Sequence, residues 1–268
     1  MALKQQSLTV WMNNETVKQK FTDLLGKNAP AFMSSAITIY NSNKQLQECD
    51  TRSILGALGL AATLNLSITP TLGQAYIVPF KGKAQFQIGF KGLIQLAHRT
   101  ERFERLHAGK ICEGEIKSFN PLTGEPERGD KISDTVVGYI AYMKLVNGFE
   151  KYLYMTLAEI EAHAEKYSQS YSYDKRSGKK SSPWSTNFDA MASKTVLKKL
   201  LGTWGRLSIE MVNAIQGDQS VVDKNTFTYV DNGGDSQNRD EIFIGEVDEE
   251  TGELKEATEN GTTDNDRV

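Results

Sequence analysis

The clearest pattern of hydrophobic and polar positions along the chain lies in residues 76–102. Residues 76–80 form a β-rich apolar run, and in residues 84–88 apolar side chains alternate with polar ones, as in a half-buried strand. Lys81-Gly82 between the two runs is a turn candidate, because glycine adopts positive φ without strain. After Gly89, apolar positions recur at helical spacing, with basic and amide side chains on the opposite face. This stretch therefore predicts a β-hairpin followed by an amphipathic helix.

Patterns of the same kind predict the remaining elements. Helices are expected at residues 15–25, 30–40, 51–64, 157–167 and 187–202, and strands at residues 103–112, 116–119, 136–145 and 149–155. Asn147-Gly148 is a strong hairpin signal, and Thr156 with Glu159 forms a capping box. Residues 168–183 are polar, basic and without periodicity, which predicts a loop, either one that orders on a ligand or a plain flexible one. The predicted fold class is α+β, a small antiparallel sheet with hairpins packed against helices.

Charge divides the chain into two parts. Residues 218–268 hold 15 acidic and 4 basic residues, so this segment carries −11, and with the whole chain at −3 residues 1–217 carry +8. We predict a body of residues 1–217 and an acidic, largely disordered C-terminal tail of residues 218–268. A basic body indicates a polyanion as partner. The tail either competes for the same surface, recruits a partner or serves solubility.

Composition narrows the setting. The hydrophobic content of 39% fits a globular core, and the longest apolar run, residues 54–64, is too short to span a bilayer. The N-terminus lacks the pattern of a signal peptide. The two cysteines are far apart in sequence and form no CxxC pattern. We therefore expect a cytoplasmic protein that does not associate with a membrane.

Enzyme motifs are scarce. The phosphate-cradling patterns G-x-x-x-x-G-K-[ST] and G-x-G-x-x-G are absent, and the three histidines lack metal-ligand spacing. We expect neither an ATP-driven motor nor a bound cofactor. The enzymatic alternative is a metal-dependent nuclease, because Glu115-Ile116-Lys117 fits an acid-x-Lys fragment and Glu113 or Asp130 would add a carboxylate for Mg²⁺. Such triplets arise by chance in a chain this charged, so a surface strand is the simpler interpretation.

Basic side chains accumulate between aromatic ones, a composition that suits a protein binding single-stranded nucleic acid. No carboxylate occurs between Asp50 and Glu101, whereas a solvated face usually mixes signs. Trp184, next to the basic loop, is the favoured residue for base stacking. The candidate DNA-binding residues are Lys81, Lys83, Lys91, Gln95, Arg99, Arg102, Lys175, Arg176, Trp184, Lys194, Lys198, Lys199 and Arg206.

Four long motifs carry a resemblance to a known family. They are LGQAYIVPFKGKAQFQIGFKGLIQLAHRT (residues 72–100), SFNPLTGE (118–125), VVGYIAYMKLVNGFEK (136–151) and WSTNFDAMASKTVLKKLLGTWGRLSIEM (184–211). Through them, residues 15–213 resemble the RecT family of phage and prophage single-strand annealing proteins. The tail shows no comparable match.

The resemblance implies a function without classical enzymatic catalysis. The expected protein is an ATP-independent recombinase that coats single-stranded DNA, pairs it with a complementary strand and assembles into rings or helical filaments in the cytoplasm of a bacterial host. A phage exonuclease and a host single-strand-binding protein are the implied partners, and Mg²⁺ is expected only to modulate DNA binding or assembly. The resemblance also implies a core similar to that of the lambda Red annealing protein, with residues 189–204 as the DNA-facing helix and Lys194 as its clearest position.

Overall fold

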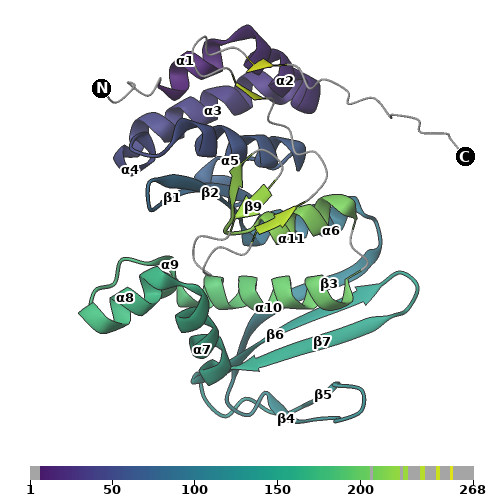
Figure 1. Ribbon diagram of the computed structural model, residues 1–268. Helices are drawn as coiled ribbons and strands as arrows, with labels where there is room; N and C mark the ends of the chain where they lie inside the picture. The colour runs from purple at the N-terminus through teal and green to yellow at the C-terminus, as the bar shows by residue number, and fades with distance from the viewer. Residues whose placement is uncertain are drawn as a thin grey trace, which may run out of the picture.

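A computed structural model describes residues 7–205 and 208–223, together with the backbone of four short strands beyond them (Figure 1). Its helices are α1 (Leu8–Asn13), α2 (Glu15–Leu25), α3 (Ala29–Ser42), α4 (Lys44–Gln47), α5 (Thr51–Thr63), α6 (Phe90–Arg99), α7 (Leu157–Tyr167), α8 (Gln169–Ser177), α9 (Pro183–Thr186), α10 (Phe188–Trp204) and α11 (Ile209–Gly217). Two 3₁₀ turns, η1 (Gly26–Asn28) and η2 (Pro70–Leu72), connect helices and strands. Its strands are β1 (Ala75–Phe80), β2 (Lys83–Ile88), β3 (Phe103–Cys112), β4 (Ile116–Phe119), β5 (Pro126–Arg128), β6 (Val136–Leu145), β7 (Glu150–Thr156), β8 (Val221–Asp223), β9 (Thr226–Thr228), β10 (Ser236–Asn238), β11 (Glu246–Val247) and β12 (Leu254–Lys255).

The first half of the chain builds a helical layer with a hairpin against it, at the top of Figure 1. Helices α2, α3 and α5 pack together, and the antiparallel β1–β2 hairpin lies on α5. Helix α5 allows this close approach because small residues such as Gly56 and Gly59 are buried along it. The hydroxyl of Ser53 on α5 also accepts a hydrogen bond of 2.8 Å from the backbone N–H of Ala84 on β2. The hairpin is thereby fixed to the helical layer.

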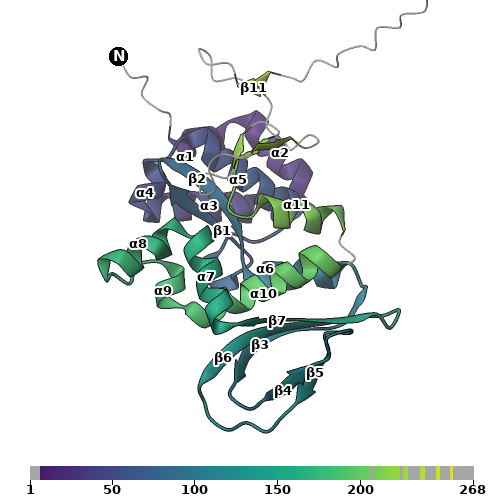
Figure 2. The ribbon, with the colours of Figure 1, turned by 60° about the horizontal axis from the view of Figure 1, so that its bottom comes forward.

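A three-stranded antiparallel sheet in the order β3-β6-β7 forms the other half, with α10 packed along one face (Figures 1 and 2). The apolar side of α10, including Val196, Leu197, Leu200 and Leu201, is fully buried. Helices α6 and α11 contact the opposite side of α10, so this helix lies between the sheet and the upper layers (Figure 1). Helix α10 is therefore covered on two sides, by the sheet and by α6 with α11.

Several predictions from sequence are confirmed. The fold is α+β with small antiparallel sheets packed against helices. Asn147-Gly148 connects β6 and β7, with Gly148 at φ +88°, and the capping box of Thr156 and Glu159 opens α7. The predicted helix at residues 15–25 is α2, and Asn14 caps it by accepting hydrogen bonds from two backbone N–H groups of the first turn.

The segment 168–183 differs from the prediction, because most of it forms helices α8 and α9 instead of an irregular loop. The carboxylate of Asp174, only 2% exposed, explains the order. It accepts hydrogen bonds from Ser181, Ser182 and Ser185, at distances of 2.7–2.9 Å. These serines looked like flexible-linker residues in the sequence, and a single buried acceptor changes their role.

The packed body continues beyond Gly217. Ser220, Val221 and Val222 are at most 1% exposed, and β8 packs against α5 and β2. The first residues of the predicted tail, from Asp218 onward, are therefore part of the core. The prediction of disorder for the rest of the tail falls largely outside the described residues. Among the described helices, none combines the length and the hydropathy required to cross a membrane.

Candidate nucleic-acid interface

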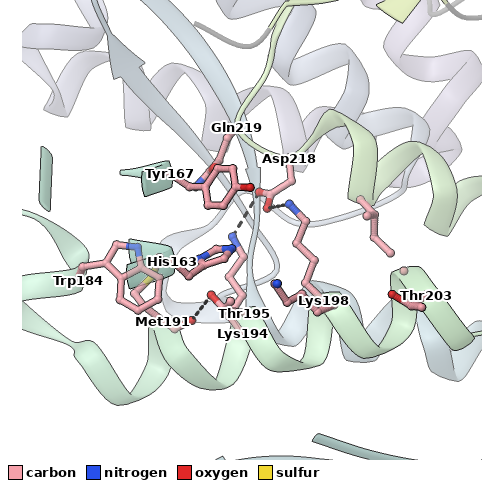
Figure 3. A pocket seen from close by; sticks show the side chains of 13 residues that line it. His163, Tyr167, Trp184, Met191, Lys194, Thr195, Lys198, Thr203, Asp218 and Gln219 are labelled. Atoms are coloured by element: carbon pink, nitrogen blue, oxygen red, sulfur yellow. Dashed lines mark hydrogen bonds and ion pairs between the residues drawn. The ribbon is translucent and has the colours of Figure 1, made fainter. Parts of the chain in front are cut away.

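A pocket of about 350 Å³ lies between α7, α10 and the segment that follows α11 (Figure 3). One end is aromatic, with His163, Tyr167 and Trp184 in its lining. The other end is lined by basic residues of α10, and Asp218 lies opposite them. Aromatic and cationic groups in one pocket suit a ligand that carries both negative charge and flat, apolar parts.

Helix α10 positions the basic groups. Lys194 and Lys198 lie one turn apart, so both side chains leave the helix on the same side, away from the sheet. In Figure 3 both extend toward Asp218. Lys199 is exposed and lines the same pocket, as does Gly202. Apart from the backbone of α10 itself, a Cβ at Gly202 would meet only a methyl group of Ile215, at 3.8 Å, so the helix surface is open there and a ligand can approach its backbone closely.

The carboxylate of Asp218 pairs with both lysines. Its Oδ1 lies 3.3 Å from Lys194 Nζ and its Oδ2 lies 2.6 Å from Lys198 Nζ. The side chains of Asp218 and Lys194 are 2% and 10% exposed, whereas Lys198 is 28% exposed. Lys194 is therefore a buried partner of Asp218, while Lys198 also faces the pocket.

Burial and charge act against each other in this cluster. Burial alone would raise the pKa of the Asp218 carboxyl, but the charges of Lys194 and Lys198 outweigh it and hold that pKa below its ordinary value. Burial lowers the pKa of the Lys194 ammonium, and Asp218 counteracts this effect. The carboxylate is thus a condition for keeping Lys194 charged.

His163 lies near the same lysines but carries no charge at neutral pH. Burial, followed by the charges of Lys199, Lys198 and Lys166, lowers the pKa of His163 from 6.5 to about 4. Its buried Nδ1 has no hydrogen-bond partner among the described residues.

This shift predicts how stability depends on pH. Between pH 6.5 and pH 4 the unfolded chain binds a proton at His163 that the folded protein does not, so the free energy of unfolding falls as the pH falls through this window. His163→Asn removes the titration. We expect the melting temperature of the wild type to drop more between pH 7.5 and pH 5 than that of the variant, measured by differential scanning fluorimetry. Equal drops would contradict the depressed pKa.

The structure brings together four of the predicted DNA-binding residues, Trp184, Lys194, Lys198 and Lys199, around this pocket. Trp184 is only 4% exposed and packs edge-on against Phe188, with ring centroids 5.4 Å apart. Its ring therefore belongs to an aromatic cluster, and part of it borders the pocket.

The other predicted residues lie elsewhere. Lys81 and Lys83 are exposed at the tip of the β1–β2 hairpin, and Lys81 lies over the ring of Phe80 at 5.0 Å. Gln95 and Arg99 line a separate pocket between α6 and the helical layer. Lys91 on α6 and Arg102 after it are exposed. Lys175 pairs with Glu165, and Arg176 donates a hydrogen bond to the Ser172 carbonyl of its own helix. Arg206 lies outside the described residues.

Arg99 has a contact that accounts for its charge without a ligand. Its guanidinium donates hydrogen bonds of 2.6 Å to the carbonyls of Leu64 and Asn65, at the end of α5. It therefore caps the C-terminus of that helix, where a cation is favourable.

The acidic residues of the nuclease alternative have structural contacts. Glu115 accepts a hydrogen bond from the backbone N–H of Cys112, and Glu113 accepts one from the Ser133 hydroxyl. Within the part of the chain that the structure describes, no three His, Cys, Asp or Glu residues lie close enough to share a metal ion. No observation in this region favours the nuclease.

The lining residues that sequence reasoning missed include His163, Tyr167 and Asp218. His163 and Tyr167 are four positions apart on α7, a spacing that reads equally well as ordinary helix packing. Asp218 stands at the start of an acidic run, so nothing in the sequence separated it from the tail.

These features define the class: an α+β protein with a cationic, aromatic-edged pocket on its longest described helix. Comparison with known proteins then identifies the family. The RecT family model matches residues 30–231, so the chain belongs to the RecT family, whose members are DNA recombination and annealing proteins. The chain is 43% identical over 217 residues to the uncharacterized protein YqaK of Bacillus subtilis (strain 168), covering 80% of this chain and 73% of that protein. It is 28% identical over 231 residues to protein RecT of Escherichia coli (strain K12), covering 81% and 82%.

Proposed function

We propose that this protein binds single-stranded DNA along the pocket face of α10 and anneals complementary strands without ATP. The observation that carries the proposal is the convergence of Lys194, Lys198 and Lys199 on one pocket. Membership of the RecT family supports annealing as the activity. The charge of +8 over residues 1–217 provides long-range attraction for a polyanion.

The three lysines have unequal parts in this proposal. Lys198 and Lys199 reach the pocket from its rim, so they are the groups that meet phosphate oxygens first. Lys194 lies deeper and contributes charge from behind them. Phosphate contacts of this kind give affinity without sequence preference, which is what a protein that pairs arbitrary complementary strands requires.

Annealing by this mechanism needs no nucleotide hydrolysis. Lysines neutralise part of the charge on one strand, so a second strand meets less repulsion, and base pairing supplies the driving free energy. The bases stay accessible because the protein holds the strand by its backbone. A core similar to that of the lambda Red annealing protein, assembly into rings or filaments, a phage exonuclease, a host single-strand-binding protein and a modulating role for Mg²⁺ remain parts of the proposal that follow from the family.

A strand-pairing assay tests the proposed function. Two labelled complementary oligonucleotides are incubated with protein and Mg²⁺ in the absence of ATP, and the products are separated on native and denaturing gels. We expect rapid formation of duplex with strands of full length. Shortened strands would support the nuclease, and a pairing rate equal to that without protein would contradict annealing.

A further inference from the structure

The pocket proposed to receive phosphate contains a buried carboxylate. Its negative charge repels phosphate, so its presence in the pocket calls for an explanation. Asp218 lies with its side chain 2% exposed between the ammonium groups of Lys194 and Lys198 (Figure 3). Its Oδ1 accepts a third hydrogen bond, of 3.0 Å, from the backbone N–H of Ile88 on β2. Both carboxylate oxygens are thus occupied by donors from two different parts of the fold.

The backbone next to Asp218 is held just as firmly. The N–H of Gln219 donates to the carbonyl of Phe86 at 2.8 Å, and the N–H of Phe86 donates to the carbonyl of Ser220 at 3.1 Å. This pairing fixes the segment to β2, and β2 is itself fixed to α5. Asp218 is therefore a rigid connection between the hairpin and helix α10.

Charge alone does not explain the carboxylate. Without it, Lys194 would be left buried without this counterion, and a lone buried lysine favours its neutral form. The positive charge lost at Lys194 would then offset the negative charge removed at Asp218. Removing Asp218 therefore does not simply make the pocket one unit more positive, whereas the contacts of its two oxygens with Lys194, Lys198 and the Ile88 N–H fix where the ammonium groups lie.

We propose that Asp218 is a positioning residue for DNA binding, whose carboxylate holds Lys198 at the pocket wall by tying it to the edge of β2. This inference rests on the proposed function. Lys198 uses one N–H for Asp218, and its remaining N–H groups are available to a phosphate. Fixing a long, flexible side chain beforehand removes the entropy cost of ordering it when DNA binds.

Asp218→Asn tests this role, because the amide keeps the shape and can still accept from Ile88. Affinity for a fluorescent oligo-dT is measured by anisotropy over a series of salt concentrations. We expect Kd to rise about tenfold, and the slope of log K against log salt to fall in magnitude by about 0.7, the loss of one phosphate contact. A general loss of stability would not change this slope. Glu210→Gln, the same chemical change at an exposed site on α11, should leave both quantities unchanged.

A second pair of variants decides the matter if Asp218→Asn folds poorly. Lys194→Met leaves the Asp218 carboxylate paired with Lys198 alone. Lys194→Met/Asp218→Asn also removes the carboxylate that holds Lys198, and no buried lysine is then left without a counterion. Positioning predicts that the double variant binds DNA more weakly than Lys194→Met, although it carries one negative charge fewer. Tighter or equal binding by the double variant would overturn the role of Asp218. A wild type that fails to bind would instead overturn the proposed function, and the positioning role with it.

Discussion

Lys194→Glu is expected to remove a large share of the protein's folding stability. The change removes the partner of a carboxylate that is 2% exposed and places a second carboxylate beside it. Breaking a buried ion pair by changing one partner costs about 3–5 kcal/mol, and repulsion between the two acids adds to this loss. Since a domain is typically stable by only about 5–15 kcal/mol, this loss is a large fraction of the total free energy of unfolding. Urea unfolding followed by circular dichroism measures the effect.

Lys175→Glu is the matched control for this experiment. Lys175 also pairs with a carboxylate, that of Glu165, but both side chains are exposed to solvent, at 45% and 46%. Exposed pairs contribute little, so the unfolding midpoint of this variant should stay close to that of the wild type. If the two variants unfolded at the same urea concentration, Lys194 would not be the buried partner that the structure shows.

Lys198→Glu/Lys199→Glu is expected to abolish binding of single-stranded DNA while the fold persists. Lys198 also pairs with Asp218, but its side chain is 28% exposed, so a glutamate at this position can turn toward solvent while Lys194 remains as the counterion of Asp218. Lys199 is exposed and lines the pocket. The double charge reversal therefore costs less stability than reversal at Lys194 and acts mainly on the ligand. The double variant should bind oligonucleotides on the order of 100-fold more weakly, with a flatter dependence on salt, because two phosphate contacts are replaced by repulsion. Anisotropy titrations measure the affinity, and circular dichroism checks the fold.

Lys27→Glu/Lys44→Glu provides the charge-matched comparison. These two lysines are exposed in the helical layer, on η1 and α4, away from the pocket (Figure 1). The variant changes the net charge by the same amount, so a comparable loss of affinity would show that only overall charge matters. If the control variant keeps the affinity of the wild type and Lys198→Glu/Lys199→Glu loses it, DNA binds at the pocket.

The elements of the fold were largely predictable because each has a local signal. The Asn147-Gly148 turn, the capping box at Thr156 and the period-2 pattern of β2 depend on neighbours within a few residues. Residues 168–183 escaped prediction because their order depends on Asp174, which gathers three serines through hydrogen bonds. Composition alone predicts that such a segment is flexible, because it does not show that the Asp174 carboxylate is buried and accepts these hydrogen bonds.

The sequence predicted the lysines of the candidate site but not the carboxylate of Asp218 that pairs with them. The spacing of Lys194 and Lys198 places them together on a helix, and this follows from helix geometry. Asp218 comes to them from 20 or more positions away in sequence, through pairing of its neighbours with Phe86, and no periodic pattern encodes that contact. The family resemblance favoured Lys194 as a position facing DNA, and its pairing with Asp218 in the interior could not be seen from the sequence.

We propose that phosphates of single-stranded DNA bind at Lys198 and Lys199, the lysines on the pocket rim. Lysine acetylation footprinting by mass spectrometry, with and without saturating oligonucleotide, tests it most directly. We expect DNA to protect Lys198 and Lys199 strongly, while the modification of Lys27 stays unchanged. Equal modification of Lys198 and Lys199 in free and DNA-bound protein would contradict it.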